Sequence, residues 1–159
     1  LTYGLSFDAT YKDFDLSLLF QGSLGNEIYN AAKYYFMRFD GRQNVRSDYL
    51  DEYWTGENSS NSQPAVTNDL TRNSRNYRNS DYYIEDGSYL RLKTLQVGYN
   101  YAPTFIKGAK PTFRFYISAQ NLLTFTSYSG FEPEVSDISV DRGQYPQPRS
   151  FMLGTVINF

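Results

Sequence analysis

The sequence of 159 residues contains no cysteine and no histidine. Without cysteine the chain can form no disulfide and offers no thiolate to a metal, and without histidine it lacks the usual zinc ligand and the base of a catalytic triad. The formal net charge is only −2, and the 15 basic residues are dispersed. Because no basic stripe is present to follow a phosphate backbone, we expect no nucleic-acid partner.

Long hydrophobic runs are missing too, since no run approaches the roughly 18 apolar residues of a membrane helix. The sequence opens on Leu1-Thr2-Tyr3-Gly4, which is neither a signal peptide nor an initiator methionine, so we expect a chain cut from a longer protein. What the sequence has in excess is aromatic residues, at 18%, with 16 tyrosines, 12 phenylalanines and one tryptophan. This composition indicates heavy use of amphipathic rings.

Alternation of apolar and polar residues predicts five β-strands, each with one apolar face. In the first of them, for example, Leu5 and Phe7 alternate with Ser6 and Asp8. The five segments are about 3–10, 13–21, 89–101, 112–124 and 150–159. In the third strand the apolar phase slips near Lys93, which predicts a β-bulge.

The connections between these strands are alternately short and long. The two long ones, about 22–88 and 125–149, are rich in polar and turn-forming residues, and loops of such length are usually functional or disordered. Within the first, apolar residues recur at helical spacing over 27–39, which predicts a short amphipathic helix. These residues are Ile28, Ala31, Ala32, Tyr35, Phe36 and Phe39.

The pattern as a whole fits an all-β, antiparallel transmembrane β-barrel. Such barrels have strands of about 9–11 residues, an apolar outer face, a polar interior, short periplasmic turns, long extracellular loops and aromatic residues near the strand ends. The mean hydropathy of −0.57 agrees, because half of each strand and all of the loops would meet water. Five strands cannot close a barrel whose smallest members have about 8, so this fold requires further strands. A soluble, carbohydrate-binding β-sandwich is the alternative on pattern alone.

Three motifs carry a resemblance to a known family. They are YIEDGSYLRLK at 83–93, QNLLTFT at 120–126 followed by YSGFEPE at 128–134, and YPQPRSF at 145–151. Together with the terminal Phe159 and the first hairpin, they resemble the SusC/RagA-like TonB-dependent outer-membrane transporters of Bacteroidetes. The resemblance covers most of the chain outside about 40–80.

The resemblance implies a particular architecture and activity. It implies a barrel of about 22 strands closed by an N-terminal plug, of which this chain would be the last five, with the plug domain absent. The family imports oligosaccharides or peptides, using a TonB complex that acts through the missing N-terminal region and usually a SusD-like surface lipoprotein as partner. This function makes and breaks no bonds, so we expect neither an enzyme nor a cofactor.

The final strand has a separate implied role. In the family, a strand that ends on an aromatic residue is read by the barrel-assembly machinery, and the C-terminus lies on the periplasmic side of the outer membrane. Its odd-numbered residues are expected to face lipid. The residues that carry this signal here are Phe151, Leu153, Thr155, Ile157 and Phe159.

Two aromatic residues in the first long loop are candidates for contact with a ligand or a lid, since Tyr53 and Trp54 can stack on a sugar ring. Packing against the plug or the lid is the alternative for both. The neighbouring Asp51 and Glu52 suggest a glycosidase pair, but adjacent loop residues give no reason to expect the separation of about 5 Å that retaining enzymes need. An outer-membrane hydrolase is therefore a weak rival.

The charged residues complete the candidate sites. Arg114 lies in a strand, where a lipid-facing charge costs about 2–4 kcal/mol, so we expect it to face the lumen, paired with plug carboxylates. An acidic cluster in the second long loop has the oxygen chemistry for Ca²⁺ but not the spacing of an EF-hand. We expect a solvated or docking loop and no metal there. The cluster is Glu132, Glu134, Asp137 and Asp141.

Overall fold

The computed structural model describes residues 1–37, 44–47, 49–56, 62–66, 78–103, 111–135 and 138–158. The chain divides into two compact units. The large-sheet unit contains Leu1–Asn26, Gly87–Tyr128 and Pro146–Phe159, and the small-sheet unit contains Glu27–Asp86 and Ser129–Tyr145. The chain thus leaves the first unit after β2 and again after β6, and returns to it each time.

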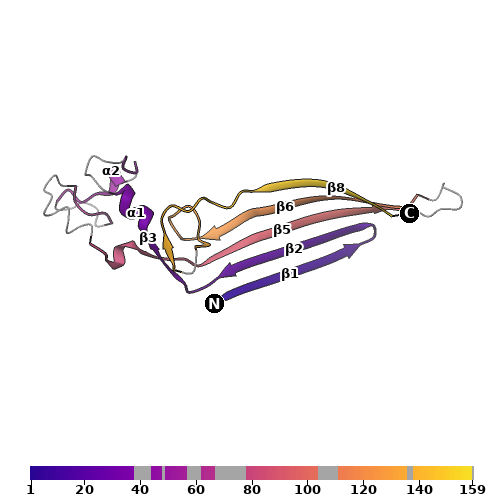
Figure 1. Cartoon of the computed structure of the whole chain (residues 1–159), viewed down its shortest axis with the longest axis horizontal. Helices are drawn as coiled ribbons and strands as arrows, with labels where there is room; N and C mark the ends of the chain where they lie inside the picture. Colours follow the sequence, from indigo (N-terminus) through magenta and orange to yellow (C-terminus); the bar gives the residue numbers. More distant parts are fainter. Residues whose placement is uncertain are drawn as a thin grey trace. The chain divides into compact units, whose positions relative to one another are not determined.

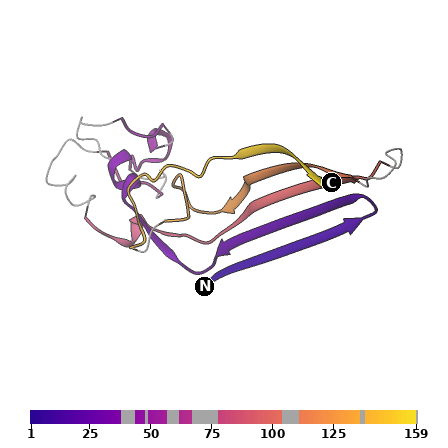
Figure 2. The same ribbon diagram turned by 45° about the vertical axis from the view of Figure 1, so that its right-hand side comes forward.

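The large-sheet unit is a single antiparallel sheet. Its strands lie in the order β1-β2-β5-β6-β8, and Figures 1 and 2 show them side by side. They are β1 (Thr2–Tyr11), β2 (Phe14–Ser23), β5 (Tyr89–Tyr101), β6 (Thr112–Thr126) and β8 (Ser150–Asn158). Every neighbouring pair is antiparallel, so β1 and β5 end, and β2 and β6 begin, at one end of the sheet, and the chain leaves for its long excursions at the other. The predicted antiparallel, all-β architecture is confirmed.

The first hairpin turns in two residues, since Tyr11 pairs with Phe14 across Lys12 and Asp13. Lys12 has φ of 54°, in the left-handed region that a side chain with a Cβ adopts at a cost. The alternating apolar residues on both sides keep the register fixed, because a slip by one residue would exchange the two faces of the sheet.

The predicted bulge is confirmed in β5. Leu19 pairs with Thr94 whereas its neighbour Phe20 pairs with Leu92, so Lys93 is the extra residue. Since β2 keeps strict alternation, Leu92 and Leu95 both lie across from apolar residues of β2, although they are three positions apart. The bulge therefore turns a break in the sequence pattern into a continuous apolar face.

The small-sheet unit contains a second sheet, which the sequence did not predict. Its order is β4-β3-β7, with β3 antiparallel to β4 and parallel to β7. The strands are β3 (Glu27–Asn30), β4 (Ile84–Asp86) and β7 (Val140–Asp141), accompanied by α1 (Ala31–Phe36), α2 (Tyr49–Glu52) and the 3₁₀ helix η1 (Asp81–Tyr83). Segments more than fifty residues apart thus form one sheet.

The helix predicted over 27–39 is confirmed only for Ala31–Phe36. The prediction is wrong for Glu27–Asn30, which form β3 because both β4 and β7 supply partners for their backbone groups. Asn30 begins the helix, since its side-chain oxygen accepts a hydrogen bond from the backbone N–H of Lys33 at 2.8 Å. Phe39, the last residue of the predicted stripe, lies outside the described residues.

The core of the small-sheet unit is small and aromatic. Ile28 and Tyr83 are each 1% exposed, and burial of such side chains contributes about 1.5–3 kcal/mol each. The Tyr83 ring contacts three other tyrosine rings, at centroid distances of 5.0 to 6.0 Å. They are Tyr29, Tyr34 and Tyr82. Among the described residues, none of the helices has the length and hydrophobicity that crossing a membrane requires.

Candidate functional site

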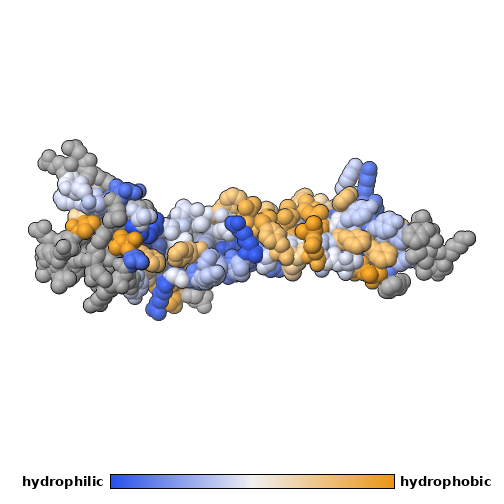
Figure 3. All heavy atoms as spheres, turned by 90° about the horizontal axis from the view of Figure 1, so that it is seen from above, coloured by the Kyte–Doolittle hydropathy of each residue, from blue (hydrophilic) through white to orange (hydrophobic). Residues whose placement is uncertain are grey.

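The large sheet carries a face of exposed apolar side chains, which we call the apolar face. Even on β6, which has a strand on either side, Phe115 and Ile117 are 48% and 57% exposed, and Leu153 on the edge strand β8 is 82% exposed. Soluble domains seldom leave so large a contiguous apolar patch uncovered. In the space-filling view, apolar residues gather over these strands (Figure 3). The face comprises Leu5, Phe7, Tyr11, Phe14, Val97, Tyr99, Phe115, Ile117, Phe151, Leu153 and Ile157.

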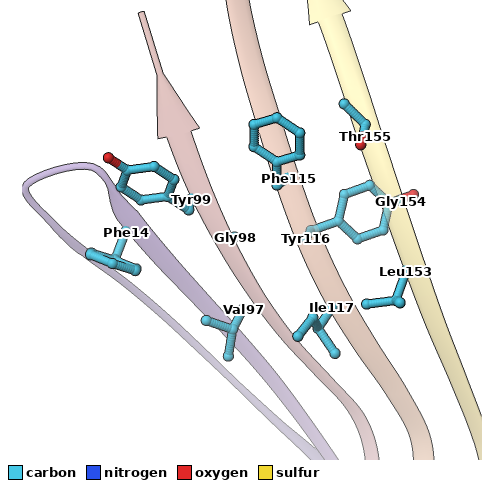
Figure 4. Close-up of a pocket in the computed structure, with 10 residues that line it drawn as sticks. All are labelled: Phe14, Val97, Gly98, Tyr99, Phe115, Tyr116, Ile117, Leu153, Gly154 and Thr155. Atoms are coloured by element: carbon cyan, nitrogen blue, oxygen red, sulfur yellow. The ribbon is translucent and has the colours of Figure 1, made fainter.

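A shallow cavity of about 530 Å³ lies along this sheet, lined from four adjacent strands (Figure 4). Aromatic rings from β2, β5 and β6 stand beside aliphatic side chains from β5, β6 and β8. Those that the figure labels include Phe14, Val97, Tyr99, Phe115, Ile117 and Leu153. Such a surface offers no charged group, so it suits acyl chains rather than a polar ligand.

The opposite face of the sheet carries a polar cluster around Asp15. Arg114 donates two hydrogen bonds to this carboxylate, from Nε to Oδ1 at 3.0 Å and from Nη2 to Oδ2 at 2.6 Å, and Asn100 donates a third at 3.1 Å. The two-pronged geometry is the strongest form of this ion pair. The cluster ties β2, β5 and β6 together across their polar sides.

Two glycines make room for this cluster. A Cβ on Gly98 would lie 2.5 Å from both carboxylate oxygens of Asp15 and 2.8 Å from Nη2 of Arg114, so a larger residue there would displace the paired ends of these two side chains. Next along the face, the guanidinium of Arg114 lies 5.2 Å from the centroid of the Tyr116 ring. That ring in turn covers Gly154, where a Cβ would lie 2.3 Å from a ring carbon.

Arg114 has a carboxylate partner within this chain. Its side chain is opposite in phase to Phe113 and Phe115, as predicted, but a carboxylate for it comes from this chain, on β2. No plug carboxylate is needed to satisfy it. That this face borders a lumen stays a prediction.

The small-sheet unit has its own charged cluster, centred on Glu85 of β4. Ser129 donates to both carboxylate oxygens, from its backbone N–H and from its hydroxyl, each at 2.9 Å. The Lys33 ammonium lies 3.3 Å from Oε1, and the Asn30 amide donates to the same oxygen at 3.3 Å. Glu85 thereby joins α1, β4 and the segment that follows β6.

The electrostatics of this cluster favour the ionised carboxylate. Burial raises the pKa of Glu85, but the two hydrogen bonds from Ser129 and the nearby Lys33 charge outweigh burial and hold the pKa below its ordinary value. Lys33 also donates to the carbonyl of Tyr82 at 3.0 Å and lies 4.2 Å from the centroid of its ring. Burial, followed by the charges of Tyr83 and Glu85, raises the pKa of Tyr82, whose hydroxyl contacts Gln63.

The acidic cluster differs from the expected solvated loop. Glu132 and Asp141 are 1% and 0% exposed, so a solvated loop is wrong for these two, and the alternative of a docking loop stays a prediction. Glu132 accepts a hydrogen bond from the backbone N–H of Glu134, and Asp141 accepts from those of Gly143 and Gln144. By accepting these hydrogen bonds, the two buried carboxylates hold the backbone of the loop in its conformation. Asp137 lies outside the described residues, within which no group of metal-ligating side chains comes together.

The remaining candidates are not brought together by the described structure. Trp54 is 48% exposed, and its backbone N–H donates to the carbonyl of Gln63 at 3.2 Å. Tyr53 forms an isolated bridge with the same residue. In β8, Phe151, Leu153, Thr155 and Ile157 share the apolar face by register, and Phe159 lies outside the described residues. The roles assigned to these residues stay predictions.

Comparison with known proteins gives close likenesses over the whole chain, although no family model matches it. The TonB-dependent receptor P3 of Formosa agariphila is 37% identical over 99% of this chain and 16% of that protein. The TonB-dependent receptor SusC of Bacteroides thetaiotaomicron is 31% identical over 98% of this chain and 15% of that protein. Among solved structures, the RagAB peptide importer in its closed-closed state matches with a TM-score of 0.77 and 27% identity, over 97% of this chain and 16% of that chain.

Fold and likeness together define the class, which is a segment of the wall of an outer-membrane β-barrel. The uncovered apolar face and the hydrogen-bonded polar face are the two sides that such a wall requires. The chain belongs to the SusC/RagA-like TonB-dependent receptors, as its motifs implied. It spans about a sixth of the length of the relatives that it matches. The predicted fold class is confirmed over the soluble β-sandwich.

Sequence reasoning missed the partners of both charged clusters. Asp15 and Glu85 stood within motifs that carry the resemblance, but nothing local indicated what they bind. Ser129 is 44 residues from Glu85, and Arg114 is 99 residues from Asp15. The sequence did contain one indication of the cluster around Asp15, which is Gly98. A glycine inside a strand often marks a place where neighbouring groups approach closely.

Proposed function

We propose that this chain forms part of a transporter that imports oligosaccharides or peptides across the outer membrane, with TonB as the source of energy and a SusD-like lipoprotein as partner. In this proposal the large sheet is a portion of the barrel wall, and the small-sheet unit belongs to the extracellular mouth. The turn between β1 and β2 and the C-terminus then lie on the periplasmic side. Transport requires no covalent chemistry from the chain.

The observation that carries this proposal is the two-sidedness of the large sheet. In water, every Å² of exposed apolar surface costs about 25 cal/mol, so a stable protein places the apolar face against hydrocarbon. On the other face, the pairing of Arg114 with Asp15 satisfies charges that would border an aqueous interior. The family of the chain supports the coupling to TonB.

Within this proposal the candidate residues have specific roles. Arg114 faces the lumen and stiffens the wall by joining β5 and β2 to β6 through Asp15 and Asn100. Tyr53 and Trp54 contact ligand or the lid lipoprotein. The apolar residues of β8, with Phe159, form the signal for the barrel-assembly machinery, and outer-membrane lipid covers the apolar face.

The experiment that tests the proposal uses the full-length protein in its native membrane. Native and heated samples should migrate differently on a detergent gel, because a barrel stays folded until heated. Cells lacking the gene should lose uptake of one class of oligosaccharide or peptide, and abolishing the proton-motive force should stop uptake in cells that retain it. Uptake that continues without the proton-motive force would falsify the energised mechanism.

A further inference from the structure

A pocket of about 330 Å³ lies within the small-sheet unit, between α1 and the segment that follows β6. This is within the range of about 300–1,000 Å³ that is usual for small-molecule sites, at its lower end. Two phenyl rings and two basic side chains are among its described lining residues, and no acidic one is. The lining therefore combines apolar surface with positive charge.

The apolar wall of the pocket is formed by Phe36 at the end of α1 and Phe131. Their rings meet edge to face, with centroids 6.4 Å apart and planes at 87°. Phe131 is nevertheless 60% exposed, so much of its surface is uncovered although the ring is held in place. An anchored, uncovered ring can pack against a sugar ring or an apolar side chain with little loss of entropy on binding.

The polar side chains that line the floor of the pocket already have hydrogen-bond or ion-pair partners. Asn30 is 2% exposed and donates to Glu85 and to the Ser129 hydroxyl, each at 3.3 Å. The Lys33 ammonium is held by the carbonyl of Tyr82 and by Glu85. Because Lys33 and Ser129 compensate the Glu85 charge, the floor does not repel an anion.

Arg46 supplies positive charge at the rim. It is an exposed residue, and its backbone N–H donates to the carbonyl of Phe36 at 3.3 Å, which places it beside the apolar wall. A guanidinium binds a carboxylate through two parallel hydrogen bonds, which a lysine ammonium cannot do. Arg46 and Phe131 thus line the same pocket.

We propose that this pocket binds a carboxylate that is attached either to a sugar ring, which has an apolar C–H face, or to an apolar side chain, with Arg46 taking the carboxylate and Phe131 packing against the apolar surface. The inference rests on the proposed function, since it assigns this ligand to the imported substrate. Two sources share the chemistry, namely a uronic-acid unit of an oligosaccharide and the C-terminal residue of a peptide.

The test is a binding measurement on the purified full-length receptor by calorimetry, with two matched probe pairs. One pair is the disaccharide of galacturonic acid and its methyl ester, and the other is the peptide Gly-Gly-Phe and its C-terminal amide. In one pair the acid should bind about five- to tenfold more tightly than its neutral analogue, the size expected for one hydrogen-bonded charge. The pair that shows this preference identifies the source, and raising the salt concentration should reduce it.

Two variants and two controls assign the effect to the pocket. Arg46→Gln should abolish the preference for the acid, whereas Arg142→Gln, which removes another exposed arginine of the same unit, should leave it intact. Phe131→Ala should weaken the binding of the acid and of its neutral analogue to the same extent. Tyr145→Ala should change the binding of neither probe.

Equal binding of acid and neutral probe in both pairs, absence of binding to any probe, or a preference that survives Arg46→Gln would overturn the inference. If uptake still depends on the proton-motive force in that case, the proposed transport function stands. If uptake does not depend on the proton-motive force but the preference for the acid is observed, the proposed transport function is refuted and the inference about the pocket stands. Differing migration of native and heated samples verifies that each variant is folded.

Discussion

The two units of this protein place their polar and apolar groups in opposite ways. In the large-sheet unit, apolar side chains such as Ile117 are exposed, and the charged pair of Arg114 and Asp15 is about three-quarters buried. In the small-sheet unit, the fully buried side chains include the acids Glu132 and Asp141. The same chain therefore follows two different rules for what is covered and what is exposed.

The two units are therefore built for different surroundings. A buried carboxylate is tolerated only when hydrogen bonds replace its water, as the backbone N–H groups of Gly143 and Gln144 do for Asp141. An exposed apolar face is tolerated only when something other than water covers it. We infer that the small-sheet unit is built for contact with water and that the large sheet is stable where hydrocarbon meets its apolar face.

The largest effect is expected when the same charge is placed on either face of one strand of the large sheet. Val97 lies on the apolar face, and its neighbour Gln96 points to the opposite side, across from Ser118. Val97→Arg should destabilise the assembled full-length barrel by about 2–4 kcal/mol, because lipid must then accept an arginine. Gln96→Arg should lower the free energy of unfolding by well under half of this, because its side chain lies on the polar face. Urea unfolding in liposomes measures both, and equal costs would show that the apolar face does not meet lipid.

The next prediction concerns the small-sheet unit alone. Glu85→Gln should destabilise it by about 1–3 kcal/mol, because Lys33 loses its carboxylate partner while the Ser129 and Asn30 contacts are only partly kept. Hydrogen exchange of the segments around Ser129, in the full-length receptor, measures this loss. Ser129→Ala provides a milder second variant, since it keeps the backbone N–H donor to Glu85.

The same carboxylate gives this unit a pH dependence with a defined sign. The pKa of Glu85 lies below its ordinary value of 4.5 in the folded unit, so the unfolded chain binds this proton more strongly. The stabilisation is therefore complete above pH 4.5 and is lost as the pH falls through the folded pKa. In Glu85→Gln the acid-induced loss of protection around Ser129 should be smaller. Identical acid profiles for the two proteins would contradict the assignment to Glu85.

The sequence was sufficient to predict the large sheet. Its strands are long and largely alternating, and even the irregularity at Lys93 was visible as a change of phase. Where the apolar pattern repeats every two residues over ten positions, it determines which face is covered and leaves little to distant contacts.

The small-sheet unit was not predictable in the same way, for a physical reason. β3 has four residues and β7 has two, too few to establish a period, and they form because partners from distant segments complete their hydrogen bonds. The apolar spacing around Ile28 suggested a helix, yet Ile28 pairs with Glu85 in a strand. Likewise, the burial of Glu132 and Asp141 depends on backbone donors that no sequence pattern displays.

A smaller effect is expected at the polar face of the large sheet. A double-mutant cycle with Arg114→Gln and Asp15→Asn should give a coupling energy of about 1–2 kcal/mol, because the pair has two parallel hydrogen bonds but remains about a quarter exposed. Arg114→Lys should recover only part of this coupling, since an ammonium cannot make both bonds at once. Unfolding of the full-length barrel provides the four free energies. A coupling near zero would mean that the polar face contributes no stability through this pair.

The smallest expected effect has the opposite sign and lies in the turn between β1 and β2. Lys12 has φ of 54°, and a glycine adopts this conformation without the Cβ clash that a lysine has. Part of the gain is offset by the greater freedom of glycine in the unfolded chain, so Lys12→Gly should stabilise the full-length barrel by about 0.5–1 kcal/mol. Asp13→Gly is the matched control: Asp13 has no positive φ, so it gains nothing and should lower stability slightly. If both glycines lower the free energy of unfolding, the turn is not strained at Lys12, and the register of the hairpin rests on its alternating strands alone.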